Sequence, residues 1–201
     1  MTLAVYIGAA LHMLIVYGGI IRFVLGLPVV NFFRGILDAM MVAYSTSSSS
    51  ATLPLTIRAT TENLGVQKSV AGSVLPLGST INMDGTSLYL GIVALFTAQA
   101  FGYQLQLLRT LPAYCAHRRA RLHGTAGVPP ASLFLLSIVL DVFEVSPEHV
   151  ALIVGFIFPF DRLLDMMRTV VNVTGDAAVA TAVAKWEGEL DEMCSGRKPG
   201  R

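Results

Sequence analysis

The 201-residue chain contains little charge and little cysteine, and each shortage argues against a class of protein. Asp, Glu, Lys and Arg make up 13% of the residues, about half the share of a typical soluble domain, which indicates a chain that lies in lipid. The net charge of +1 gives no basis for binding nucleic acid. The two cysteines, Cys115 and Cys194, are too few and too isolated for a disulfide framework or a metal cluster.

The N-terminal segment also lacks the features of a signal peptide. No positive residues precede the apolar run from Leu3 to Ile21, and no small-residue cleavage site follows it. This uncharged run of about 20 residues is long enough, at about 1.5 Å per residue, to cross the hydrocarbon core of a bilayer. His12 lies within it, where a single histidine usually packs in the core or lines a cavity.

Long apolar stretches dominate the chain, which is 54% hydrophobic, with a mean hydropathy of +0.65. Polar or Gly/Pro-rich breaks interrupt them at Ser45–Ser50, Asn82–Gly85 and Gly124–Pro130. Lipid tolerates such backbone only where it is buried in protein or lines a water-filled cavity. Two re-entrant tips and an interrupted helix are typical of a secondary transporter that binds its cargo near the bilayer midplane.

The strongest chemical signal is a polar stripe on one helix face. At about 100° per residue its members fall within about 100° of one another: Asp165, Arg168, Thr169, Asn172 and Asp176. Placing a charged residue at the centre of a membrane-spanning helix costs at least about 2.5 kcal/mol, so these charges need an explanation. An internal Asp165–Arg168 salt bridge is the simpler interpretation, but it leaves Asn172 and Asp176 unexplained.

The stripe suits an acidic amino acid. Arg168 can hold a side-chain carboxylate with a bidentate fork. Asp165 can accept a hydrogen bond from an α-ammonium group, and Asn172 can donate one to an α-carboxylate. Asp176 is a hard oxygen ligand that suits Na⁺ better than it suits a soft metal.

The segment Asn82–Thr86, which follows Pro76 and Gly78, is a second signal. Glycine and proline unwind a helix and free carbonyls that can coordinate a cation, and Asn82 and Asp84 add side-chain oxygens. A loop asparagine and aspartate in a soluble protein would look the same, but this segment lies between two apolar stretches.

The third signal is the serine run from Ser47 to Ser50. Small hydroxylated residues let a hairpin tip pack closely and present backbone amides to an anion. A serine run is otherwise typical of a flexible linker. The apolar arms on both sides favour the hairpin tip.

At these three motifs together, residues 1 to about 190 resemble the dicarboxylate/amino acid:cation symporter family, which includes glutamate and neutral amino acid transporters. The resemblance implies an all-α membrane protein that is not an enzyme, and the transport-domain half of that fold. The association of interrupted helices with a binding site near the bilayer midplane is itself known in part from such transporters. The implied partial transport domain, residues 1–190, consists of a transmembrane helix (3–27), a first re-entrant hairpin (31–66), a broken helix (70–108), a second hairpin (106–146) and a last helix (150–187), before a polar tail (188–201).

The resemblance also implies roles for individual residues. Arg168, with Thr86, would bind the side-chain carboxylate of the substrate, Asp165 and Thr169 its amino group, and Asn172 its α-carboxylate. The remaining substrate contacts would come from the two tips, at Ser48, Ser49, Ser50, Gly127 and Val128. The implied sodium ligands are Gly78, Asn82, Asn172 and Asp176 in one site, Asp84 and Asn82 in a second, and Thr80 and Thr125 in a third.

Substrate and ion follow from the same resemblance. Relatives that carry C4-dicarboxylates have no need for an acidic residue at position 165, and carriers of neutral amino acids have no need for Arg168. The presence of both favours L-aspartate or L-glutamate, with a C4-dicarboxylate as the alternative. Proton-coupled relatives show asparagine where this chain has Asp176, so the extra carboxylate favours Na⁺ as coupling ion. We expect symport by alternating access, with no other cofactor, in a bacterial inner (plasma) membrane.

The chain departs from the family in two ways. Family members are about twice as long and homotrimeric, and the scaffold helices that make the trimer are expected to be absent here. Residues 108–123 replace an apolar arm with a basic stretch that contains Arg118, Arg119 and Arg121. Each arginine would be costly in lipid and would break the positive-inside pattern.

We hypothesise that this basic stretch is translated out of frame, and an uninterrupted reading frame on resequencing would refute it. A basic surface loop is the simpler alternative. The alternative to a working symporter is that the chain is a truncated or locally frameshifted, non-functional fragment of such a transporter. A Ser-His-Asp hydrolase is disfavoured, because the sequence contains no Gly-x-Ser-x-Gly elbow.

Overall fold

The computed structural model describes residues 1–103, 131–142 and 145–191. Within these ranges the chain is built of helices, which confirms the prediction of an all-α protein. The elements, in chain order, are α1 (Thr2–Leu11), the π-helical turns η1 (His12–Tyr17) and η2 (Ile20–Val24), α2 (Val29–Gly35), α3 (Leu37–Thr46), α4 (Ser49–Glu62), α5 (Lys68–Ile81), α6 (Asp84–Phe101), α8 (Ala131–Val142) and α9 (Pro147–Glu187).

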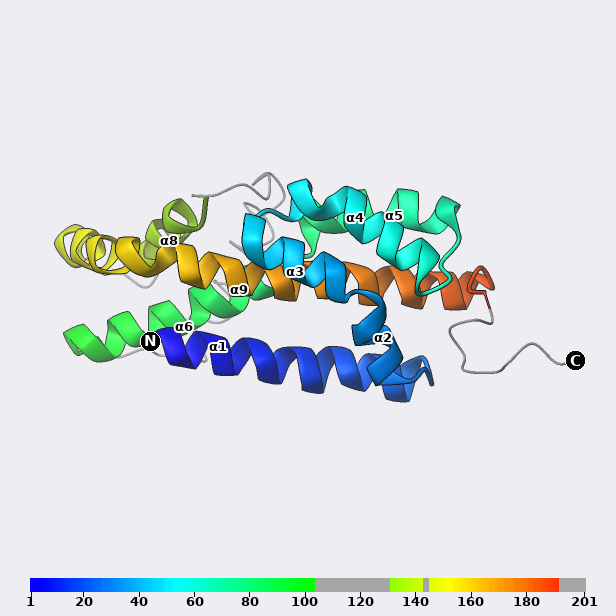
Figure 1. Ribbon diagram of the computed structural model, residues 1–201. Helices are drawn as coiled ribbons and strands as arrows, with labels where there is room; N and C mark the ends of the chain where they lie inside the picture. The colour runs from blue at the N-terminus through cyan, green and yellow to red at the C-terminus, as the bar shows by residue number, and fades with distance from the viewer. Residues whose placement is uncertain (104–130, 143–144, 192–201) are drawn as a thin grey trace, which may run out of the picture.

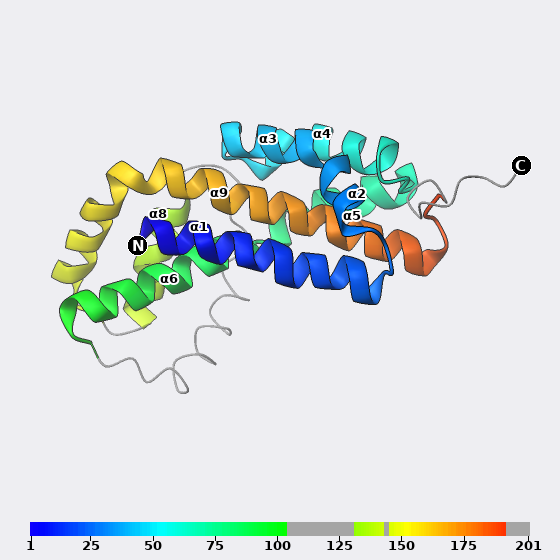
Figure 2. The same ribbon diagram turned by 60° about the horizontal axis from the view of Figure 1, so that its bottom comes forward.

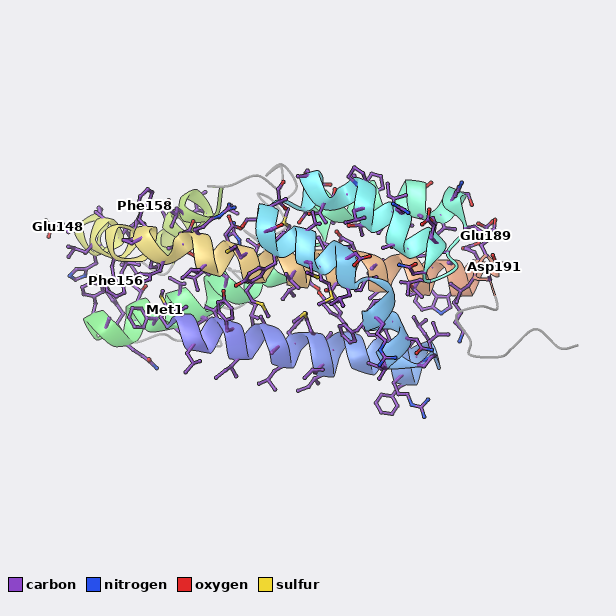
Figure 3. The ribbon with its side chains drawn as sticks, in the orientation of Figure 1. Met1, Glu148, Phe156, Phe158, Glu189 and Asp191 are labelled. Atoms are coloured by element: carbon purple, nitrogen blue, oxygen red, sulfur yellow. The ribbon has the colours of Figure 1, made fainter. Side chains whose placement is uncertain are left out.

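The long helix α9 forms the axis of the molecule, and α1, α3, α4, α5, α6 and α8 all pack against it. Its 41 residues correspond to about 60 Å of helix. Glu148 and Glu189 consequently lie at opposite ends of the molecule (Figure 3). The Ser146 hydroxyl caps the first turn, Pro147 occupies the first helical position, and Gly188 ends the helix at φ +74°, each a residue that suits its place.

The first half of α9 turns away from the second half, as Figure 2 shows in the yellow part of the helix. This part contains Pro159, which lacks the N–H that a helix interior needs and so favours a bend. Phe158 is 68% exposed, whereas Ile157 is buried. Phe156 is 55% exposed and stacks on Phe96 of α6, with ring centroids 6.2 Å apart.

Helices α5 and α6 meet at a break of the kind predicted from the Asn-Met-Asp-Gly segment. Asn82 and Met83 leave helical geometry, with φ/ψ of −88°/77° and −105°/50°. Beyond the break α6 ends at Phe101, because Gly102 adopts φ +71°. Residues 104–108 of the range 70–108 expected from the sequence lie outside the described residues. Among the described residues, two stretches are long and apolar enough to cross a membrane, Thr2–Val24 with 23 residues and Lys68–Phe101 with 34 residues.

Helices α3 and α4 pack side by side as a helical hairpin (Figure 1). Ser47 makes the turn in the left-handed region at φ 54°, ψ 31°, and Ser48 then caps α4. The arm before the turn is interrupted at Ile36 (φ −103°, ψ 5°), which separates α2 from α3. This interruption was not expected from the sequence.

Candidate substrate and ion site

The polar stripe of α9 is buried in the middle of the bundle. Its side chains belong to residues that are at most 7% exposed: Asp165, Arg168, Thr169, Asn172 and Asp176. The helical spacing places them on one face, which α5 and α6 contact at Asp176, Asn172 and Arg168. Because buried charges and amides need partners, the contacts of each residue show how the site is held.

Arg168 and Asp165 form an ion pair. The Nε and Nη2 atoms of Arg168 both lie 2.7 Å from Asp165 Oδ1, so the i, i+3 salt bridge that the spacing allows is present. The Thr169 hydroxyl donates to the Asp165 carbonyl at 2.8 Å and lies 3.4 Å from Oδ1. Arg168 Nη1 is buried and has no hydrogen-bond partner within the described part of the chain. The pair thus leaves one guanidinium nitrogen available to a ligand.

Tyr89 and Asp161 support Arg168 from α6 and from the preceding turns of α9. The Tyr89 ring lies under the guanidinium, with its centroid 5.4 Å from Cζ, and its hydroxyl donates to Asp161 Oδ1 at 3.2 Å. Sequence reasoning assigned neither residue a role. The signal for Tyr89 was available, since a tyrosine inside an apolar helix needs a partner for its hydroxyl.

Asn172 joins the first turn of α6 to α9. Its Oδ1 accepts a hydrogen bond from the Gly85 N–H at 2.8 Å, and its Nδ2 donates to the Thr86 hydroxyl at 3.2 Å. A Cβ atom at Gly85 would collide with the backbone carbonyl of Arg168. Glycine at this position therefore lets the two helices approach closely and brings Thr86 to the stripe.

Asp176 meets the other side of the break. Asn82 Nδ2 donates to Asp176 Oδ1 at 3.1 Å, and a Cβ atom at Gly78 would lie 2.7 Å from the same oxygen. Gly175 is equally constrained, because a Cβ there would lie 2.6 Å from Asn82 Nδ2. The structure thus brings together Gly78, Asn82 and Asp176. Thr80 lies in the last turn of α5, where its hydroxyl donates to the Leu77 carbonyl at 2.9 Å.

Asp84, at the start of α6, is contacted from the N-terminal helix. The Tyr17 hydroxyl donates to Asp84 Oδ2 at 3.0 Å, and His12 Nε2 lies 3.8 Å from the same oxygen. The rings of His12 and Tyr17 pack edge to face, with centroids 4.9 Å apart. Tyr17 was not identified from the sequence, because nothing local links it to a residue so far along the chain.

Ser47 to Ser50, which we call the serine tip, lie at the turn between α3 and α4. Ser47, Ser48 and Ser49 are buried and Ser50 is exposed. The Ser48 hydroxyl accepts from the Ala51 N–H at 3.2 Å, and Ser47 Oγ is buried without a hydrogen-bond partner in the ranges that the structure describes. The predicted ligands Thr125, Gly127 and Val128, and the basic stretch 108–123, lie outside the described residues.

Residues 1–186 match the sodium:dicarboxylate symporter family. The chain belongs to this family. Members are membrane transporters and not enzymes, as the sequence indicated. The chain is 38% identical to "Excitatory amino acid transporter 5" of Homo sapiens, over 91% of this chain and 32% of the relative.

Two further relatives agree. Identity is 39% to "Excitatory amino acid transporter 4" of Rattus norvegicus, over 95% of this chain and 34% of the relative. It is 36% to "Proton/sodium-glutamate symport protein" of Bacillus subtilis (strain 168), over 92% of this chain and 41% of the relative. The chain spans roughly a third of the length of these curated relatives.

Proposed function

We propose that residues 1–190 form part of the transport domain of a sodium-coupled symporter for L-aspartate or L-glutamate. The domain would work by alternating access in a bacterial inner (plasma) membrane, with α3 and α4 as the first re-entrant hairpin. The observation that carries this proposal is the buried guanidinium of Arg168, whose Nη1 has no partner among the described residues. A buried, unpaired donor on a fixed cation favours an anionic ligand.

The neighbours of Arg168 support an amino acid rather than a simple anion. Arg168 and Thr86 would receive the side-chain carboxylate, and Asp165 and Thr169 the amino group. Asn172 would contact the α-carboxylate through its amide nitrogen, since its Oδ1 is occupied by the Gly85 N–H. This contact would replace the weak hydrogen bond that Nδ2 donates to Met83 Sδ at 3.5 Å. The remaining contacts would be backbone groups of Ser48–Ser50 and of Gly127 and Val128.

Sodium is the coupling ion that the oxygen groups around the helix break favour. Asp176, Asn82 and Gly78 lie together, and with the Asn172 carbonyl they would form one site. Asp84 and Asn82 would form a second, and the carbonyls of Thr80 and Thr125 a third. Carboxylate, amide and carbonyl oxygens are hard ligands, which suit Na⁺.

Uptake of radiolabelled L-aspartate into proteoliposomes tests the proposal, with Arg168→Cys as the site variant. Arg58→Cys is the matched control, because Arg58 is an exposed arginine bound to Glu62 at 2.9 Å. We expect uptake that needs an inward sodium gradient, survives in the Arg58 variant and is lost in the Arg168 variant. Correctly inserted protein without uptake would identify a non-functional fragment, and uptake without sodium would exclude the coupling.

A C4-dicarboxylate is the second candidate. Asp165 already has Arg168 as its partner, so it does not need an amino group of the substrate to balance its charge. Unlabelled succinate and unlabelled L-aspartate are compared as competitors in the same uptake assay. An acidic amino acid symporter is inhibited by L-aspartate far more strongly than by succinate. The reverse order would assign the dicarboxylate.

A further inference from the structure

Arg162 is a charged residue of α9 for which the proposed binding site has no use. It precedes Arg168 by about 9 Å along the helix axis and points about 120° away from it around the axis, and it is exposed. Its Nη2 donates a hydrogen bond to the Ser45 carbonyl at 3.1 Å. In the proposed transporter an exposed arginine on this helix would be costly in lipid, so the contact with α3 calls for an explanation.

The acceptor lies at a sensitive place in the hairpin. Ser45 is in the last turn of α3, which ends at Thr46, and carbonyls at a helix C-terminus lack helical partners and carry partial negative charge. The chain then turns at Ser47 with a positive φ and enters the buried serine tip. The Arg162 guanidinium on the Ser45 carbonyl therefore stabilises the last helical turn before the serine tip.

A neighbouring contact ties the same two helices together. The Tyr6 hydroxyl of α1 donates to the Leu163 carbonyl at 2.9 Å and lies 3.4 Å from the Tyr44 hydroxyl. Arg162 is thus linked directly to Ser45, and the next residue of α9, Leu163, is linked through Tyr6 to Tyr44. Among these links, the Arg162 contact is charge-assisted and so is the stronger.

We propose that Arg162 is a positioning residue that holds the end of α3, and with it the serine tip, against α9. The inference rests on the proposed function, in which the tip covers the substrate beside Arg168. Arg162 does not contact the substrate itself. It acts by limiting the positions that the backbone of the serine tip can adopt, which lowers the entropy lost when the substrate binds.

Pulsed electron paramagnetic resonance tests the positioning without any substrate. Nitroxide labels are attached through Ser45→Cys and Val179→Cys, two exposed positions, in protein with Cys115→Ser and Cys194→Ser. Arg162→Leu removes the donor and is expected to broaden the distance distribution, whereas Arg162→Lys keeps a donor and largely restores it. Arg58→Leu is the matched control and leaves it unchanged. An equally narrow distribution in Arg162→Leu would overturn the proposal, as would a broad one before any change at Arg162.

Binding of L-aspartate at saturating sodium, measured with the native cysteines in place, links the positioning to function. We expect Arg162→Leu to weaken binding about tenfold, the effect of losing one charge-assisted hydrogen bond, with the lysine variant and the Arg58→Leu control near the parent protein. Equal affinity in the leucine variant would refute the link. If the unchanged chain binds no aspartate, the proposed function fails, and the distance measurement still decides whether Arg162 positions the tip.

Discussion

The first and second parts of α9 differ in the polar side chains that they bury. From Pro147 to Phe160 the helix buries Ile153 and Ile157 and exposes aromatic residues such as Phe158. From Asp161 onward it buries carboxylates, an arginine and an asparagine beside apolar residues such as Leu164 and Val171, while Leu163 is 47% exposed. One continuous helix therefore has an apolar buried face at one end and a buried polar stripe within an apolar core at the other.

The energetic difference between these two parts supports the site that we propose in the second. Burial of apolar surface stabilises a fold by about 25 cal/mol per Å². Burial of an ion pair costs several kcal/mol per ion before the mutual attraction of the charges offsets it. The Asp165–Arg168 pair is consequently poor evidence for stability, and its burial is better explained by a ligand that needs it. The following experiments test this contrast.

The largest effect is expected at the ion pair. Arg168→Leu leaves the Asp165 carboxylate buried and unpaired, which should destabilise the protein by about 3–5 kcal/mol and abolish aspartate uptake. The double variant Arg168→Leu/Asp165→Leu should recover most of the stability but none of the uptake. Denaturant unfolding in detergent and proteoliposome uptake measure the two quantities. A double variant as unstable as the single one would show that the pair is mainly structural.

Gly85 and Gly91, both in α6, provide a matched comparison of close and open packing. Gly85→Ala places a Cβ against the Arg168 carbonyl, whereas a Cβ at Gly91 meets nothing within 4 Å. We expect Gly85→Ala to destabilise the protein by about 1–3 kcal/mol, and Gly91→Ala to stabilise it by about 0.5–1 kcal/mol. Thermal unfolding of both variants is the measurement, and equal midpoints would contradict the close approach.

Tyr89 should show a smaller, graded effect. Tyr89→Phe keeps the ring under Arg168 and removes the hydrogen bond to Asp161, which should weaken aspartate binding by about 1 kcal/mol. Tyr89→Leu also removes the cation–π contact and should add about 0.5–1 kcal/mol. Titration of binding across the two variants checks the order, and a leucine variant that binds as well as the parent would exclude Tyr89 as a support for Arg168.

The smallest effect is expected in the first half of α9. Phe158 is 68% exposed, so Phe158→Leu should change stability by no more than about 0.5 kcal/mol and leave sodium-driven uptake unchanged. The same unfolding and uptake assays apply. A loss of uptake here would mean that the outer surface of the bend takes part in transport, and the contrast between the halves would no longer hold.

Local patterns were enough to predict much of the candidate site. The buried face of α9 follows from a spacing of three and four residues, and the helix break follows from Asn82, Met83 and Gly85 within one short segment. Both are properties of a few adjacent residues. The interruption at Ile36 was missed, although Gly35 stands directly before it, because one glycine within an apolar run is only a weak sign of a helix break.

Contacts between distant segments required the folded chain. Tyr89 meets Asp161, Tyr17 meets Asp84, and Arg162 meets Ser45 across separations of 72, 67 and 117 residues. No periodicity connects such residues, since the helical repeat relates only neighbours along one helix. Sequence alone thus establishes the family, the helical character and the chemistry of the stripe. Which side chain supports which is settled by how α1, α3 and α6 pack on α9, because hydrogen bonds and ion pairs act over a few ångströms whatever the distance along the chain.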